Sequence, residues 1–99
     1  MPSGTPKLEE IKSILPDITH RKMMGEYLLY RNGKLFGGIY DDRLLLKITK
    51  ASAKIDEWPS AFPYEDGPEM VLVTEPYDVQ LLNKVVDEML PELPEPKKR

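Results

Sequence analysis

Two tight turns separated by one short strand constrain this chain more than any other feature. Asn32-Gly33 and Asp41-Asp42 each interrupt a run of apolar and aromatic residues in the segment 23–49. Asn and Gly tolerate the positive φ that a two-residue type I′ hairpin requires, whereas Asp accepts it less readily. The segment therefore predicts three antiparallel strands. The first turn sets their register by placing Arg31 opposite Lys34.

The register sorts these strands into two faces, because strand side chains alternate. The predicted cross-strand pairs are Tyr30 with Leu35, Leu29 with Phe36, Leu28 with Gly37, Tyr27 with Gly38, Ile39 with Leu44 and Tyr40 with Arg43. The face expected to form the core holds Leu28, Tyr30, Leu35, Gly37, Ile39, Leu44, Leu46 and Ile48, with Glu26 at its rim. The other face mixes rings, aliphatic side chains and cations. Apart from Gly38, its members are Tyr27, Leu29, Arg31, Phe36, Tyr40, Arg43, Leu45 and Lys47, which we call the predicted mixed face.

The adjacent glycines Gly37-Gly38 lie in the middle of a predicted strand. Such a pair indicates a bulge, a sharp bend or close packing by another element. We expect a simple bend.

Three helices are predicted around the strands. Thr5-Pro6 has the features of a helix start, with Thr as the cap, and an apolar stripe continues from there to Pro16. Thr49 is expected to cap a short helix that runs through Trp58, where the indole covers the core. An apolar stripe at helical spacing predicts the third helix, from Pro76 or Asp78 to Leu90.

Two further strands, 61–64 and 69–74, flank a turn at 65–68. Pro63 places the shorter strand at an edge, and the unbroken apolar run 70–73 predicts an interior strand. The resulting order, αβββαββα, predicts an α+β fold of two layers, an antiparallel sheet covered by helices on one face. We expect one domain over residues 1–99, with disordered ends at about 1–5 and 92–99.

Charge is distributed unevenly along the chain. Residues 20–54 carry a net charge of +5 and residues 55–96 a net charge of -10, within a total of -3. The chain ends in the basic tail 97–99, which we expect to aid solubility. This asymmetry favours dimerisation by charge complementarity or contact with an anionic partner, although neutralisation within the fold is the simpler expectation.

The residues needed for catalysis are missing from the sequence. There is no cysteine, no serine in a nucleophile elbow and no phosphate-binding glycine loop. His20, the one histidine, falls in a predicted linker beside Arg21-Lys22, where it is expected to be an ordinary surface residue, with anion binding as the alternative. We expect no enzyme activity, metal or cofactor. The chain lacks a secretory segment and a membrane-spanning run, so we expect a cytoplasmic protein without membrane contact.

Several motifs resemble the N-terminal domain of the TfoX (Sxy) competence regulators. They are the runs 21–27, 29–31 with 33–34, 37–47, 63–65, 69–73 and 88–94. The resemblance implies an αβββαββα domain of a bacterial regulator of DNA-uptake competence, in a family whose full-length members assist transcription with the cyclic-AMP receptor protein. Full-length regulators carry a second, helical domain, so this chain resembles a short standalone member. The family supplies no catalytic residues.

The predicted mixed face has two functional interpretations. The preferred one is a non-enzymatic interaction module that binds a protein or a second copy of itself, because an exposed apolar patch with aromatic members is typical of protein interfaces. The alternative is single-stranded nucleic acid, whose bases stack on rings and whose phosphates pair with cations. A third possibility is that the sheet curls and Trp58 or a terminal segment covers this face.

Overall fold

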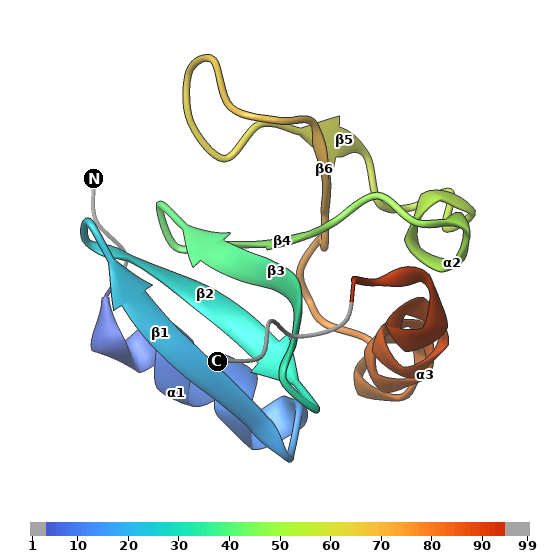
Figure 1. Cartoon of the computed structure of the whole chain (residues 1–99), viewed down its shortest axis with the longest axis horizontal. Helices are drawn as coiled ribbons and strands as arrows, with labels where there is room; N and C mark the ends of the chain where they lie inside the picture. The colour runs from blue at the N-terminus through green and yellow to red at the C-terminus, as the bar shows by residue number, and fades with distance from the viewer. Residues whose placement is uncertain (1–3, 95–99) are drawn as a thin grey trace.

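The computed structural model describes residues 4–94 and shows an antiparallel sheet with its helices on one side (Figure 1). The elements are α1 (Thr5–Ile14), β1 (Ile18–Met23), β2 (Glu26–Arg31), β3 (Lys34–Tyr40), β4 (Arg43–Leu46), α2 (Lys50–Ala53), β5 (Ser60–Ala61), β6 (Met70–Leu72), α3 (Val79–Met89) and a 3₁₀ turn (Leu90–Glu92). The strands are ordered β1-β2-β3-β4-β6-β5. The predicted α+β class is confirmed.

Both predicted hairpin turns are present. Asn32 and Gly33 have φ of 54° and 77°, and Asp41 and Asp42 have φ of 55° and 59°, all in the left-handed region that a type I′ turn requires. The pairs Arg31 with Lys34 and Tyr40 with Arg43 flank these turns as predicted. Local turn chemistry therefore positions both reversals.

A further strand precedes the predicted three. Residues 18–23, interpreted as a linker from the sequence, form β1 and pair with β2 along its whole length. Met24 and Gly25, with φ of 54° and 85°, form another two-residue turn between them. His20 therefore lies in an edge strand, where its Nδ1 is 3.2 Å from the Lys12 ammonium and its ring meets Tyr27 edge-on. The prediction that His20 lies in a linker is wrong.

A β-bulge changes the register between β2 and β3. Tyr30 faces Leu35, but the next residue, Leu29, faces Gly37, so Phe36 is the inserted residue. The predicted pairs of Leu29 with Phe36, Leu28 with Gly37 and Tyr27 with Gly38 are therefore wrong by one position in β3. In place of the bend expected at Gly37-Gly38, the strand has a bulge at the preceding residue, Phe36, and close backbone packing at the two glycines. A Cβ on Gly37 would meet the Leu45 carbonyl oxygen, and a Cβ on Gly38 would lie 2.6 Å from the Tyr27 carbonyl oxygen.

The main core lies between the sheet and the helices. Its buried members are Leu8, Ile11, Leu15, Ile18, Tyr27, Leu29, Phe36, Ile39, Leu44, Leu46, Ala51, Trp58, Val71, Val73, Leu82, Val85, Val86, Met89 and Leu93. α1 lies behind β1 and β2, while α2 and α3 lie side by side along the other half of the sheet (Figure 1). Trp58 belongs to this core, as predicted. No helix within residues 4–94 is long and apolar enough to cross a membrane.

Several element ends differ from the predicted ones. Gly4 rather than Thr5 occupies the cap position of α1. Thr49 does cap α2 by accepting a hydrogen bond from Ser52 N, but this helix ends at Ala53 instead of reaching Trp58. The strands β5 and β6 are shorter than the predicted 61–64 and 69–74, although β5 is at the edge and β6 is interior as expected.

The C-terminal end packs further than the predicted boundary at 92. Leu93 is buried in the main core, and the Glu92 carboxylate accepts hydrogen bonds from Lys50 N and Ala51 N at the start of α2. At the other end, Thr5 is already helical. The basic tail 97–99 lies outside the described residues.

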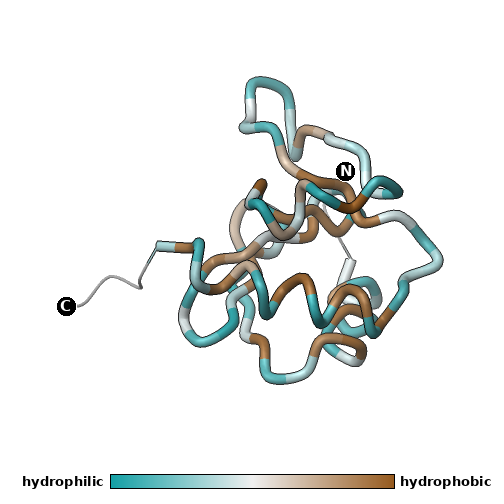
Figure 2. The backbone as a smooth tube through the Cα atoms, turned by 90° about the vertical axis from the view of Figure 1, so that its right-hand side faces the viewer, coloured by the Kyte–Doolittle hydropathy of each residue, from teal (hydrophilic) through white to brown (hydrophobic). Residues whose placement is uncertain are grey.

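The hydrophilic tip of the loop between β5 and β6 projects at the top of the molecule (Figure 2).

Candidate interaction surface

The predicted mixed face does not exist as one surface, because the bulge divides its members between the two sides of the sheet. Tyr27, Leu29 and Phe36 belong to the main core under the helices, and Leu29 and Phe36 are 0% exposed. Tyr40 and Leu45 instead form a second cluster with Met70. The prediction that these eight side chains share one exposed face is therefore wrong.

Arg31 also lies on the helix side, where it joins three elements. Its guanidinium donates to Asp87 Oδ1 at 2.9 Å and to the Pro16 carbonyl at 2.7 Å, and the side chain of Asn83 is 3.4 Å away. The residue is only 7% exposed. Arg31 thus holds β2 against α3 and against the turn that follows α1, which removes it from any nucleic-acid face.

The side of the sheet without helices carries the second, smaller apolar cluster. Tyr40, Leu45 and Met70 are buried, and Leu28, Ala61 and Leu72 pack against them while remaining partly exposed. The sequence placed Leu28 on the core face and Tyr40 and Leu45 on the opposite face. The bulge shifts the register of β2 by one residue, which brings Leu28 to the same side of the sheet as Tyr40 and Leu45. We call this side the helix-free face.

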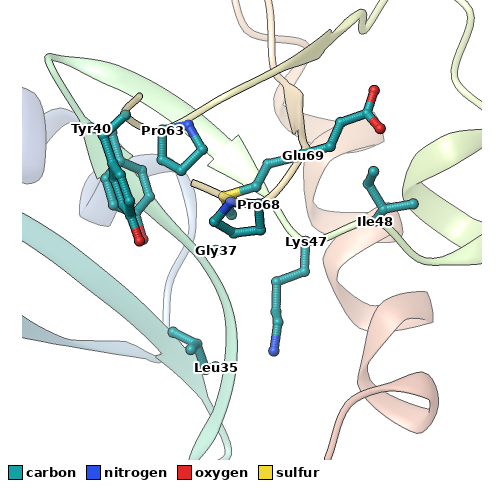
Figure 3. Close-up of a pocket in the computed structure, with 10 residues that line it drawn as sticks. Leu35, Gly37, Tyr40, Lys47, Ile48, Pro63, Pro68 and Glu69 are labelled. Carbon is teal, nitrogen blue, oxygen red and sulfur yellow. The ribbon is translucent and has the colours of Figure 1, made fainter. Parts of the chain in front are cut away.

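A groove of about 290 Å³ opens on the helix-free face between the sheet and the loop 62–69 (Figure 3). Its wall residues are Leu35, Gly37, Tyr40, Lys47, Ile48, Pro63, Tyr64, Pro68, Glu69 and Met70. The Tyr40 ring lies at one end (Figure 3). The centroid of the Tyr64 ring is 6.3 Å from that of Tyr40. Lys47 lies near the opposite end, and its side chain and that of Glu69 extend in different directions (Figure 3).

Arg43 holds the loop that forms one wall of this groove. Its guanidinium donates to the carbonyls of Phe62 at 3.1 Å and Pro63 at 3.4 Å, and its Nε donates to the Tyr40 carbonyl. Gly67 allows the Tyr64 ring to approach the turn, since a Cβ there would lie 2.9 Å from that ring. Arg43, a member of the predicted mixed face, is therefore a structural tie for the loop.

Exposed apolar side chains surround the groove. Phe62 and Tyr64 are 56% and 58% exposed on the loop, and Met24 is 94% exposed on the turn between β1 and β2. Met23, Met24, Glu26, Tyr40 and Tyr64 line a neighbouring cavity of about 370 Å³. Of these residues, sequence reasoning named only Tyr40 and missed Met23, Met24, Phe62 and Tyr64 as surface members. The available signal was Gly25, because a two-residue hairpin turn requires positive φ, which glycine adopts readily.

The electrostatics of the groove come from few groups. Burial raises the pKa of Tyr40 above its ordinary value of 10.0, and the neighbouring Tyr64, Glu26 and Tyr30 raise this pKa further. The Tyr40 hydroxyl is therefore neutral at physiological pH. Within residues 4–94, the Lys47 ammonium has no carboxylate partner. The groove wall is thus mostly apolar, and its charged members are Lys47 and Glu69.

The described part of the chain holds no group of three or more His, Asp or Glu side chains that could ligate a metal ion. The only histidine in the sequence is His20, which is exposed on β1 and contacts a lysine. What the groove offers chemically is apolar contact, an exposed aromatic ring at Tyr64 and the charges of Lys47 and Glu69.

The family described as TfoX N-terminal domain matches residues 9–82. No curated protein and no solved structure matches this chain. The matched range includes the whole sheet and the loop that borders the groove.

Proposed function

Because this chain belongs to the TfoX N-terminal domain family, we propose that it is a non-enzymatic protein-interaction module of a cytoplasmic bacterial regulator. We extend the proposal to the process that the family resemblance implies, the transcriptional regulation of DNA-uptake competence. The helix-free face is the proposed contact surface. The helix-free face replaces the predicted mixed face and shares four residues with it, namely Tyr40, Arg43, Leu45 and Lys47.

The observation that carries this proposal is the exposed apolar rim around the groove. Met24, Phe62 and Tyr64 are all more than half exposed, and they border cavities on the same side of the sheet. Large apolar side chains clustered on a surface favour a protein interface, because association removes them from water. Tyr and Met are also enriched in the centres of such interfaces.

A second copy of this chain is the partner to test first. Light scattering behind size exclusion across a dilution series measures the mass of the wild type, Tyr64→Ser and Val79→Ser. Val79 is a matched control because it is 42% exposed on α3, away from the groove. A dimer weakened by Tyr64→Ser and kept by Val79→Ser supports self-association through this face.

The same variants distinguish self-association from a different partner. A monomer in all three samples rejects the homodimer, and capture of a cell protein by the wild type but not by Tyr64→Ser then identifies a heterologous partner at the same face. Equal capture by Tyr64→Ser and the wild type rejects the helix-free face as the contact surface. Phe36→Ser is unsuitable as a test, because Phe36 is part of the main core.

The regulatory part of the proposal needs a cellular assay. Transformation frequency is measured in strains that carry the wild-type chain, Tyr64→Ser or Val79→Ser, at equal protein abundance. A loss with Tyr64→Ser alone links the helix-free face to competence. Unchanged transformation after deletion of the whole chain rejects the competence role but leaves the interaction module intact.

Single-stranded nucleic acid is a second candidate ligand for the same groove. It is favoured by the exposed Tyr64 ring at one end and Lys47 near the other, since bases stack on rings and phosphates pair with cations. The acidic residues Glu65, Asp66 and Glu69 beside the groove oppose it. Binding of an oligonucleotide that falls steeply with salt would establish this candidate, and salt-independent or absent binding would reject it.

A further inference from the structure

Within residues 4–94, no strand pairs with the outer edge of β1. β1 is an edge strand, and residues 19–23 of its six are exposed. Its pairing with β2 continues without interruption from Ile18 to Met23, so the strand is regular along about 20 Å. The bulge that distorts the next pair of strands does not reach it.

The register identifies the backbone groups that this edge presents. In a two-residue hairpin the pair flanking the turn is hydrogen-bonded, and hydrogen-bonded pairs then recur at every second residue. Met23 with Glu26 is the flanking pair, so Arg21 and Thr19 direct their N–H and C=O groups toward β2. The N–H and C=O groups of His20 and Lys22 therefore point outward. Within residues 4–94 neither of them has a backbone partner on that side.

Positive charge follows the same edge on both sides of the sheet. His20 lies beside Lys12 of α1, so the alternation of β1 places Lys22 on the helix side as well and Arg21 on the helix-free side. Arg21 and Lys22 are exposed, and within the described residues neither has a carboxylate partner. By contrast, Lys7, Arg31 and Lys54 each pair with an acidic side chain.

From these two observations we infer that the β1 edge is a strand-addition site for an extended acidic peptide segment of a partner protein. The added strand pairs its backbone with His20 and Lys22, and its carboxylates meet the cations of β1. A second copy of β1 is a poor occupant, because antiparallel pairing would oppose like charges across the edge. This site is separate from the helix-free groove, so it does not depend on the proposed function.

The ladder of outward backbone groups is the reason for choosing a peptide over a nucleic acid. A polynucleotide would use the same cations but has no backbone N–H and C=O groups with strand spacing. The two occupants are distinguished by the contribution of the outward amide. The variant His20→Pro removes that amide without removing a bond to β2, whereas His20→Ala keeps it.

The test uses a blocked peptide of repeating Glu-Glu-Val-Val, which presents carboxylates on both faces of an added strand, and the same peptide with Lys in place of Glu. Each is titrated into the whole chain and followed by amide NMR. We expect the Glu peptide alone to bind. The amides of His20 and Lys22 gain protection from hydrogen exchange, whereas those of Thr19 and Arg21 are already protected by β2. The double variant Arg21→Gln with Lys22→Gln weakens binding about three- to tenfold, because exposed ion pairs contribute little each.

The backbone variants complete the test. His20→Pro abolishes binding of the Glu peptide, and His20→Ala and Tyr64→Ser retain it. Unchanged exchange at His20 and Lys22 in the wild type overturns the proposal even if His20→Pro does not fold. Equal binding of both peptides, or binding of a single-stranded oligonucleotide in place of the Glu peptide, overturns it too.

Discussion

Adjacent leucines on β2 provide the sharpest test of the bulge. Leu29 is 0% exposed in the main core, whereas Leu28 is only partly buried on the helix-free face. Leu29→Ala removes three carbon atoms, which is about 2.4 kcal/mol at roughly 0.8 kcal/mol for each, before the cavity is counted. With the cavity, the expected loss of unfolding free energy is about 3–5 kcal/mol. Leu28→Ala, the matched control, is expected to lose about 1 kcal/mol because solvent already reaches that side chain.

Urea unfolding followed by circular dichroism measures both variants. With an m-value of about 1.5 kcal/mol per M, the midpoint falls by about 2 M or more for Leu29→Ala and by less than about 1 M for Leu28→Ala. The register without a bulge predicts the opposite order, because it places Leu28 in the core. A larger loss for Leu28→Ala than for Leu29→Ala would therefore refute both the bulge and the assignment of the two faces.

Three further predictions concern single sites. Arg31→Ala lowers the unfolding free energy by about 2–4 kcal/mol, because the Pro16 carbonyl loses its donor and buried packing is lost. Asp87→Asn lowers it by less than about 1 kcal/mol, because the Asp87 side chain is exposed. Equal urea midpoints for the two variants would contradict this. Gly38→Ala loses about 1–3 kcal/mol, since its Cβ would lie 2.7 Å from the Tyr40 ring, and thermal unfolding at wild-type stability would rule out that contact. Because the pKa of Tyr40 is raised in the folded state, the unfolded chain loses the Tyr40 hydroxyl proton at a lower pH than the folded chain. The stabilisation from the neutral hydroxyl is therefore complete below pH 10.0, and the unfolding free energy falls as pH rises above that value. Tyr40→Phe is expected to reduce this fall in urea unfolding, and a pH profile identical to that of the wild type would count against it.

Local sequence signals predicted the parts of the fold that depend on neighbouring residues. Asn32-Gly33 and Asp41-Asp42 form their turns because few other residue types adopt positive φ at both positions. Thr49 caps α2 because its hydroxyl reaches the N–H of Ser52, three residues on. The apolar stripe of the last helix faces the core with Leu82, Val86 and Met89, as its 3.6-residue period requires.

β1 was missed because its evidence is not local. Its residues His20, Arg21 and Lys22 show no alternation of apolar and polar side chains, since the edge strand is exposed on both sides. Only pairing with β2 makes this segment a strand. The open edge proposed as a strand-addition site was for that reason invisible in the sequence, although its cations were counted in the basic segment 20–54.

The sequence by itself determined the turns, the helices and the apolar content of the strands, because each depends on the preferences of a few consecutive residues. Only the tertiary structure decided which side of β2 faces the helices. The backbone of β4 approaches Gly37, and Phe36 is inserted opposite no residue of β2. Since side chains alternate with a period of two, this one inserted residue turns Leu29 inward and Leu28 outward. The candidate interaction surface moved with them, from the predicted mixed face to the groove beside Tyr40 and Tyr64.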